Sequence, residues 1–241
     1  MIKLEKVSKK FGTGVFGLSD ISITVGKAEF VFLVGPTGAG KTTIFRLITR
    51  EILPTKGSII VDNWDVIKLP YSKIHHLRKK VGVVFQDLKL LMDRTIFENT
   101  ILPLEVAGVK SREGKKITEE VLEKVGIIDH RDKFPVQLSG GELQRAAIAR
   151  ALVLTPEILL ADEPTGNLDL TTAFGIAKLL EDINKKGTTV VMATHNTGIV
   201  ENLSKRVIGL DKGRLVRDDK KEQKKGGSAF AKASADKEEK K

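Results

Sequence analysis

The sequence predicts an α/β fold built on a mainly parallel sheet. Two observations support this prediction: short apolar runs alternate with longer segments of helical period, and those runs are almost continuously apolar. Continuous apolar runs are typical of strands that are covered on both faces. The clearest strands are expected at residues 30–35, 58–62, 81–85, 157–162 and 188–194.

Two further subdomains are expected beside this core. Residues 2–8 and 19–25 alternate polar and apolar side chains more openly, which favours an antiparallel β subdomain. Between about 88 and 150 the strand signals stop and helical periodicity takes over, so this stretch is predicted to be an inserted helical subdomain. Residues 170–184 are predicted to form a helix of the core, with Asp169 as its N-cap.

The chain of 241 residues and 26.4 kDa is expected to fold as one compact unit over residues 1–217. Residues 218–241 are rich in charge and low in aromatics, which predicts a disordered tail that is dispensable for chemistry. The sequence has no apolar run of membrane-spanning length and no stretch of signal-peptide type, so a cytoplasmic protein is expected. The absence of cysteine excludes disulfides and thiolate metal sites.

The net charge of +10 raises the question of nucleic-acid binding. From Lys212 onward the chain has 11 Lys and Arg against 6 Asp and Glu, so much of the excess lies in the tail and the rest is only mildly basic. Solvated charge is the simpler interpretation, for the tail and for the basic cluster at 73–80, while a tail that stays near an anionic membrane or RNA is the alternative.

A glycine-rich stretch, "GPTGAGKT" at 35–42, matches the pattern G-x-x-x-x-G-K-[ST] between a predicted strand and a predicted helix. Its glycines allow backbone N–H groups to curl around phosphate oxygens, and the helix N-terminus adds partial positive charge. Lys41 is expected to reach the β- and γ-phosphates of a nucleotide, and the Thr42 hydroxyl is placed to bind Mg²⁺. The predicted phosphate-binding residues are Gly35, Pro36, Thr37, Gly38, Ala39, Gly40, Lys41, Thr42 and Thr43.

An acidic strand end, "ILLADEP", supplies the carboxylates that such a site needs. Asp162 is expected to orient Mg²⁺ or its waters, and Glu163 to polarise a water in line with the γ-phosphate. Neighbouring residues of an extended strand point to opposite sides, so the two acids can share one task only if the chain turns there. Pro164 makes that turn plausible.

A second glycine-rich stretch, "LSGGELQR" at 138–145, has no Lys-Thr pair and no acidic strand end of its own. The Ser139 hydroxyl and the backbone N–H groups of Gly140 and Gly141 open an Ala-rich helix and could grip a γ-phosphate that is held elsewhere. If the two halves of one chain lie too far apart to meet, a head-to-tail exchange between two copies completes both sites. The sequence thus predicts a homodimer that ATP holds together and hydrolysis releases.

These residues resemble one family, the ATP-binding cassette (ABC) ATPases, over residues 1 to about 217. The resemblance implies a RecA-like P-loop NTPase core with a mainly parallel sheet, an antiparallel β subdomain and an inserted helical subdomain. Six motifs of the family occur in order: Walker A (35–42), the Q-loop "VFQD" (84–87), the signature (138–145), Walker B "ILLADEP", the D-loop "GNLD" (166–169) and the switch "ATH" (193–195).

The same resemblance implies roles for individual residues. Gln86 would sense Mg²⁺ and the γ-phosphate and couple them to a partner protein. Glu163 would be the catalytic base, His195 the switch that positions it, and Asp169 a link across the dimer interface. Phe11 aligns with the aromatic that stacks on adenine, a position often held by Tyr, and a small core aromatic is its alternative interpretation. The implied catalytic set is Lys41, Gln86, Glu163 and His195, and the implied metal set is Thr42, Gln86 and Asp162.

Within the family, residues 82–109, "MATHN" and "RVIGLDKGRLVRD" resemble the FtsE branch of cell-division ATPases, whose partner is the membrane protein FtsX. That resemblance implies a peripheral protein at the cytoplasmic face of the cell membrane. ATP-driven dimer closure would act on an FtsX-like partner, which regulates peptidoglycan hydrolysis outside. Relatives that release lipoproteins or drive macrolide efflux share "ADEPTGNLD", so the ATPase subunit of such a transporter is the alternative.

Two other functional classes fit the sequence poorly. A cassette ATPase that clamps nucleic acid in DNA repair or translation would need a long coiled-coil insertion or two cassettes in one chain, and the sequence shows neither heptads nor a second Walker A. A small-molecule or phosphotransfer kinase does not account for the signature and the D-loop. Direct binding to nucleic acid is therefore not expected.

Overall fold

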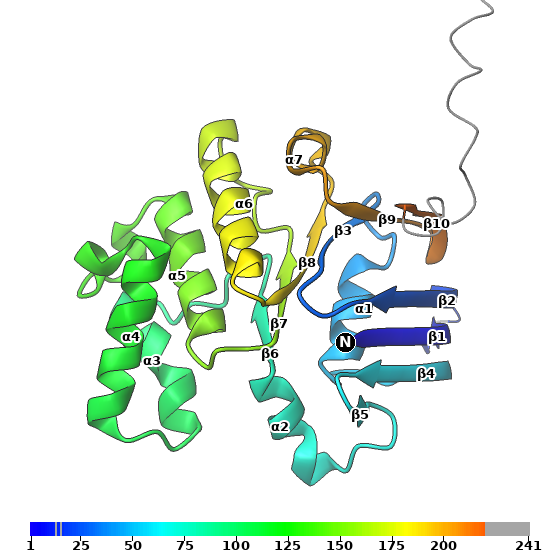
Figure 1. Ribbon diagram of the computed structural model, residues 1–241, viewed down its shortest axis with the longest axis horizontal. Helices are drawn as coiled ribbons and strands as arrows, with labels where there is room; N and C mark the ends of the chain where they lie inside the picture. The colour runs from blue at the N-terminus through cyan, green and yellow to red at the C-terminus, as the bar shows by residue number, and fades with distance from the viewer. Residues whose placement is uncertain (13, 15, 220–241) are drawn as a thin grey trace, which may run out of the picture.

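The structure, a computed structural model, describes residues 1–12, 14 and 16–219 (Figure 1). Most of the predicted tail lies outside these residues. In the described part, the fold extends beyond residue 217, where the sequence suggested that the folded domain ends. Asp218 belongs to the last strand and is buried, and the Asp219 carboxylate accepts a hydrogen bond from Val207 N, so the fold continues to at least Asp219.

The core is a six-stranded sheet of order β10-β9-β3-β8-β7-β6, in which all neighbours are parallel except the edge strand β10. This arrangement confirms the predicted mainly parallel α/β core. The strands are β3 (Phe30–Val34), β6 (Val81–Val84), β7 (Ile158–Asp162), β8 (Thr189–Thr194), β9 (Arg206–Asp211) and β10 (Arg214–Asp218).

A second, antiparallel sheet of order β2-β1-β4-β5 lies beside the core, as predicted (Figure 1). Its strands are β1 (Ile2–Lys10), β2 (Phe16–Val25), β4 (Lys56–Val61) and β5 (Trp64–Asp65). Residues 58–62 were expected among the strands covered on both faces, and this expectation was wrong. Ile59 and Val61 are fully buried but Ile60 between them is only half-buried, so the apolar run belongs to a strand with one covered face.

The segment predicted to be helical, about 88–150, contains three helices that gather on one side of the molecule (Figure 1). They are α3 (Ile96–Val106), α4 (Ser111–Val125) and α5 (Gly140–Leu152), with short 3₁₀ turns at Ile128–His130 and Pro135–Gln137. The remaining helices are α1 (Lys41–Ile48), α2 (Ile74–Lys79, preceded by a 3₁₀ turn at Tyr71–Lys73), α6 (Leu170–Lys185) and α7 (Thr197–Leu203). Within the described ranges, none of the helices has the length and apolarity to cross a bilayer.

Two hydrophobic clusters cover the opposite faces of the six-stranded sheet. Alternate residues of β7 divide between them: Ile158 and Leu160 join α1 and the antiparallel sheet, whereas Leu159 and Ala161 join α5 and α6. All four side chains are fully buried, which explains the continuous apolar run that predicted this strand. The two hydrophobic clusters hold the sheet from both faces, so the carboxyl ends of its parallel strands lie along one edge.

Helix α6 begins at the predicted N-cap. The Asp169 carboxylate accepts a hydrogen bond from Thr172 N at 3.0 Å, which confirms the capping role and lowers the pKa of Asp169 below its ordinary value. Further along the same helix, Glu181 is 12% exposed and pairs with Lys178, Lys185 and Lys205. Lys205 directly precedes β9, so this carboxylate ties α6 to the C-terminal part of the sheet.

Glu181 is expected to make stability depend on acid pH. Its pKa is lowered from 4.5 to about 2, mainly by hydrogen bonds from Lys178, Lys205 and Lys185. Because the folded-state value is depressed, the stabilisation is complete above the unfolded-state value near 4.5 and is lost as pH falls toward 2. With a discount for the exposed lysines, Glu181→Gln should cost about 1–2 kcal/mol at pH 7. Urea unfolding of both proteins should show this gap narrowing below pH 4.5, and an equal gap at pH 7 and pH 3 would contradict the assignment.

Candidate functional site

Four neighbouring parallel strands deliver the predicted site residues to one edge of the sheet. In the order β3-β8-β7-β6, each strand ends just before or within a predicted motif, and parallel strands place their carboxyl ends together. A cavity of about 410 Å³ lies there. It is lined by Phe11, Gly17, Thr37, Gly38, Ala39, Gly40, Lys41, Thr42, Thr43, Gln86, Asp162, Glu163, Gly166, Asn167 and His195.

The loop between β3 and α1 is held close to the rest of the sheet by its glycines. Gly40, the N-cap of α1, has a φ of +103°, and a Cβ there would lie 2.7 Å from the carbonyl oxygen of Gly17. Gly35 has a φ of +155°, and a Cβ would lie 2.3 Å from the carbonyl oxygen of Leu210. The predicted reason for these glycines was the approach of a phosphate. The structure adds that they also allow neighbouring backbone segments to approach the loop.

Lys41 is buried at the start of α1 and its ammonium group folds back over the loop. Its Nζ donates to the carbonyl oxygen of Gly35 at 2.7 Å and to that of Pro36 at 3.4 Å. The same Nζ forms an ion pair with Glu163 Oε1 at 3.2 Å, where both side chains are about one-tenth exposed. The structure therefore brings the predicted cation and the predicted base together across the cavity.

Thr42 and Asp162 form a second contact across the same cavity. Thr42 Oγ1 donates to Asp162 Oδ2 at 2.7 Å. Burial raises the pKa of Asp162 above its ordinary value, although the hydrogen bond from Thr42 acts in the opposite direction. Asp162 Oδ1 is buried and has no hydrogen-bond partner among the described residues. A hydroxyl next to a buried carboxylate with a free oxygen fits a hard divalent cation such as Mg²⁺.

Glu163 adopts a left-handed backbone conformation, with a φ of +48°. This conformation is uncommon for a non-glycine residue and turns the chain directly after β7, so Asp162 and Glu163 line the same cavity. The sequence predicted a turn and attributed it to Pro164, whereas the turn lies at Glu163 itself. Glu163 N donates to Ala193 O at 2.9 Å, which anchors the turn on β8.

His195 follows β8 and points its ring toward Glu163. The distance from His195 Nδ1 to Glu163 Oε2 is 2.9 Å, and the His195 side chain is 66% exposed. Phe11 and Gln86 also line the cavity, Phe11 from the end of β1 and Gln86 just beyond β6. The ring of Phe11 packs against Gly17, where a Cβ would lie 2.5 Å from Phe11 Cε2.

The second glycine-rich stretch does not reach this cavity. Ser139 caps α5 in a capping box: its Oγ donates to Glu142 Oε2 at 2.8 Å and accepts from Glu142 N at 3.4 Å. Gly140 and Gly141 pack against the neighbouring segment, and a Cβ at Gly141 would lie 2.5 Å from Thr172 Cγ2. Neither Ser139 nor the two glycines line the cavity around Lys41.

Three cavity residues were not singled out from the sequence. Gly166 and Asn167 lie in the quoted stretch "GNLD" but had been given no place in the site. Gly17 belongs to β2, and its sequence neighbours carry no motif. Its signal is purely steric, because the Phe11 ring occupies the space that a side chain at this position would need.

Comparisons with known proteins agree with the fold and the motifs. The family model described as "ABC transporter" matches residues 18–166. The chain is 48% identical over 219 residues to the cell division ATP-binding protein FtsE of Bacillus subtilis (strain 168), covering 91% of this chain and 96% of that protein. It is 42% identical over 215 residues to FtsE of Escherichia coli (strain K12), covering 89% and 97%.

A solved structure is similar at the level of the whole fold. It is a dimeric, post-hydrolysis form of the ATP-binding cassette MJ0796 bound to ADP and Pi, with a TM-score of 0.82, 35% identity and coverage of 90% of this chain and 97% of that one. The two relatives and this structure each match about nine-tenths of the chain. The chain therefore belongs to the ABC transporter family, as one of its ATP-binding cassette ATPases.

Proposed function

We propose that this chain is the ATPase subunit of a cell-division complex, a peripheral protein at the cytoplasmic face of the membrane that works as a homodimer with an FtsX-type membrane partner. The names of its relatives in Bacillus subtilis and Escherichia coli support the division role. The observation that carries the mechanism is the incomplete site: Lys41 and Glu163 meet in one cavity, whereas Ser139 lies outside it.

The phosphates of ATP bind in the loop between β3 and α1. Residues 37–40 and the N-terminus of α1 line the cavity, and free backbone N–H groups at a helix N-terminus attract negative charge. Lys41 then exchanges its carbonyl and carboxylate contacts for the β- and γ-phosphate oxygens. Phe11, which lines the cavity, offers a ring face for the adenine. Lys9 Nζ lies 5.5 Å from the centroid of that ring.

Glu163 is the general base in this proposal. Its carboxylate accepts a proton from a water that attacks the γ-phosphorus, the bond to the β-phosphate oxygen breaks, and ADP and phosphate leave. The left-handed turn at Glu163 and the contact with His195 Nδ1 fix the direction of this carboxylate. Gln86 lines the same cavity and, in this proposal, contacts the γ-phosphate and changes position when the γ-phosphate leaves.

Thr42 and Asp162 are the residues that would hold Mg²⁺, with Gln86 as the further ligand implied by the family resemblance. The ion would neutralise charge on the β- and γ-phosphate oxygens. The buried free oxygen of Asp162 supports this placement. Both residues also form part of the wall of a neighbouring cavity, so the metal site adjoins that cavity.

That neighbouring cavity, of about 850 Å³, is where we place the membrane partner. Its walls come from α1, α2, β6, α3 and α5, and they include Arg and Lys side chains as well as the exposed apolar side chains of Phe85 and Leu91. Since Phe85 directly precedes Gln86, a shift of Gln86 toward the γ-phosphate moves the surface that the partner contacts. Dimer closure can thus be transmitted without transport of any substrate.

Purification from detergent extracts of cells that produce the tagged chain tests this function. We expect an FtsX-type four-helix membrane protein to be retained, and mass spectrometry identifies it. Phe85→Glu should abolish the retention because it replaces an exposed apolar contact of the cavity wall with a charge that the partner would have to desolvate. Val216→Glu, at an exposed apolar position on β10, should leave it intact. Retention of a lipoprotein-releasing or macrolide-efflux permease instead would contradict the division role.

A further inference from the structure

The turn of the β9–β10 hairpin touches the phosphate loop. Gly213 N donates to the carbonyl oxygen of Ala39 at 3.1 Å, and the carbonyl oxygen of Gly213 accepts from Ser19 N at 2.8 Å. The hairpin tip therefore lies between the loop and β2. Lys212 and Gly213 have φ values of +45° and +74°, and positive φ at both central residues is what a two-residue type I′ turn requires.

The contact leaves no room for side chains. A Cβ at Gly213 would lie 2.8 Å from the carbonyl oxygen of Gly17, and a Cβ at Gly40 would lie 2.7 Å from the same oxygen. At the other end of the loop, a Cβ at Gly35 would lie 2.3 Å from the carbonyl oxygen of Leu210 in β9. The hairpin backbone thus packs against both ends of the phosphate loop.

The hydrogen bond from Gly213 fixes the orientation of one peptide unit. In a planar trans peptide the C=O and the N–H point in opposite directions. The Ala39 carbonyl is directed to the hairpin, so the N–H of Gly40 is directed away from it, and Gly40 lines the cavity. Glycine populates positive and negative φ about equally, so Gly40 itself, at +103°, gives little preference for this orientation.

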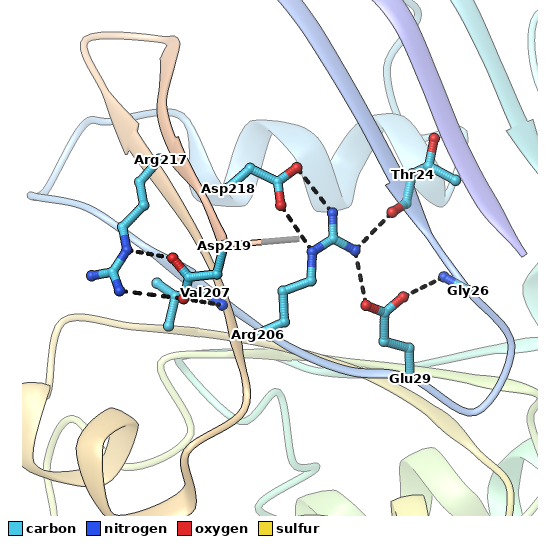
Figure 2. Close-up of polar contacts among 8 residues, drawn as sticks. All are labelled: Thr24, Gly26, Glu29, Arg206, Val207, Arg217, Asp218 and Asp219. Carbon is cyan, nitrogen blue, oxygen red and sulfur yellow. Dashed lines mark hydrogen bonds and ion pairs between the residues drawn. The ribbon is translucent and has the colours of Figure 1, made fainter. Parts of the chain in front are cut away.

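The open end of the hairpin is held by a buried ion-pair cluster (Figure 2). Arg206, in β9, donates to both carboxylate oxygens of Asp218 in β10, from Nε at 2.9 Å and from Nη2 at 3.0 Å. Arg206 Nη1 donates to Thr24 O at 2.8 Å and to Glu29 Oε1 at 2.9 Å. Because Thr24 belongs to β2 and Glu29 precedes β3, one side chain joins the hairpin to both sheets.

We propose that the β9–β10 hairpin is a brace that presents the Gly40 N–H to a nucleotide phosphate. Gly213 is a positioning residue, which acts through the Ala39–Gly40 peptide without touching the nucleotide, and Arg206 holds the brace in place. The inference rests on the proposed role of residues 35–42 in phosphate binding. Loss of the brace allows that peptide to turn, which replaces an N–H donor with a carbonyl oxygen at the phosphate.

Calorimetric titration with ADP tests the brace, because it reports affinity and the fraction of competent protein separately. Gly213→Ala is expected to weaken ADP binding about tenfold while the stoichiometry stays near one site per chain. Gly108→Ala is the matched control: Gly108 has a φ of +79°, close to that of Gly213, but a Cβ there meets no atom within 4 Å. It should bind ADP like the wild type. Wild-type affinity in Gly213→Ala, or an equal loss in both variants, would overturn the proposal.

If Gly213→Ala binds clearly less than one ADP per chain, part of the protein is misfolded. A second variant then tests the brace. Arg206→Lys keeps the charge but cannot form the two-point contact with Asp218. It should weaken ADP binding about threefold with full stoichiometry. Unchanged affinity in Arg206→Lys would overturn the brace. Failure of the wild type to bind ADP would instead contradict the proposed role of residues 35–42, so the two failures are distinguishable.

Discussion

Glu163→Gln is expected to bind ATP but to hydrolyse it at least about a hundredfold more slowly than the wild type, the usual range for loss of a general base. The amide keeps the shape and can still contact His195, but it cannot accept the proton of the attacking water. Because hydrolysis is what opens the proposed dimer, the variant should accumulate as a dimer in ATP. Phosphate release and sizing chromatography in ATP measure the two effects.

The control for this variant is Glu157→Gln. Glu157 is near the start of β7, pairs with Lys80 and does not line the cavity, so its loss should leave turnover unchanged. Hydrolysis by Glu163→Gln at the wild-type rate would show that another group takes the proton. Slow hydrolysis without a dimer would retain Glu163 as the base but would contradict the link between hydrolysis and opening.

Ser139→Arg is expected to abolish the ATP-dependent dimer and its hydrolysis while each chain still binds nucleotide. Ser139 does not line the cavity around Lys41, so the monomer's own phosphate contacts remain. In the proposed dimer, however, position 139 would meet the γ-phosphate of the other copy, and a long side chain there would prevent closure. Nucleotide titration and light scattering of the same sample measure the two properties.

Ser139→Ala separates this steric effect from the loss of the helix cap. Both variants lose the capping box with Glu142, which costs about 1 kcal/mol of stability. Only Arg adds the bulk that blocks closure, so Ser139→Ala should still dimerise, with reduced affinity. Loss of nucleotide binding in Ser139→Arg monomers would contradict the proposal that Ser139 contacts only the nucleotide of the other copy.

The sequence allowed the edge of the sheet to be predicted almost residue by residue. β3, β7 and β8 are short, mostly apolar runs that lead directly to Gly35, Asp162 and His195, and parallel pairing makes those ends meet. Asp169 was likewise recognisable as a helix cap because its chemistry is local. Local pattern and strand topology thus predicted the phosphate loop and the two carboxylates, whereas Phe11, Gln86 and His195 were expected only from the family resemblance.

The remaining features depend on contacts between distant segments. Ile60 looked like part of a fully covered strand, but β4 pairs with β1 and places Ile60 opposite Lys3, so it belongs to the antiparallel sheet. The left-handed turn at Glu163 has no sequence signature, since non-glycine residues seldom adopt it. The contact of Gly213 with Ala39 joins positions far apart in the chain, and a Lys-Gly turn predicts a hairpin but not where its tip lies.

Disulfide cross-linking tests the shared site most directly, because the chain has no cysteine of its own. Two single-cysteine proteins, Thr37→Cys and Ser139→Cys, each also carrying Glu163→Gln, are mixed with ATP and oxidised. The expected result is a covalent heterodimer that forms only in the mixture and only with ATP. Cross-linking of either protein with itself, or no cross-link in ATP, would contradict the head-to-tail exchange of phosphate contacts.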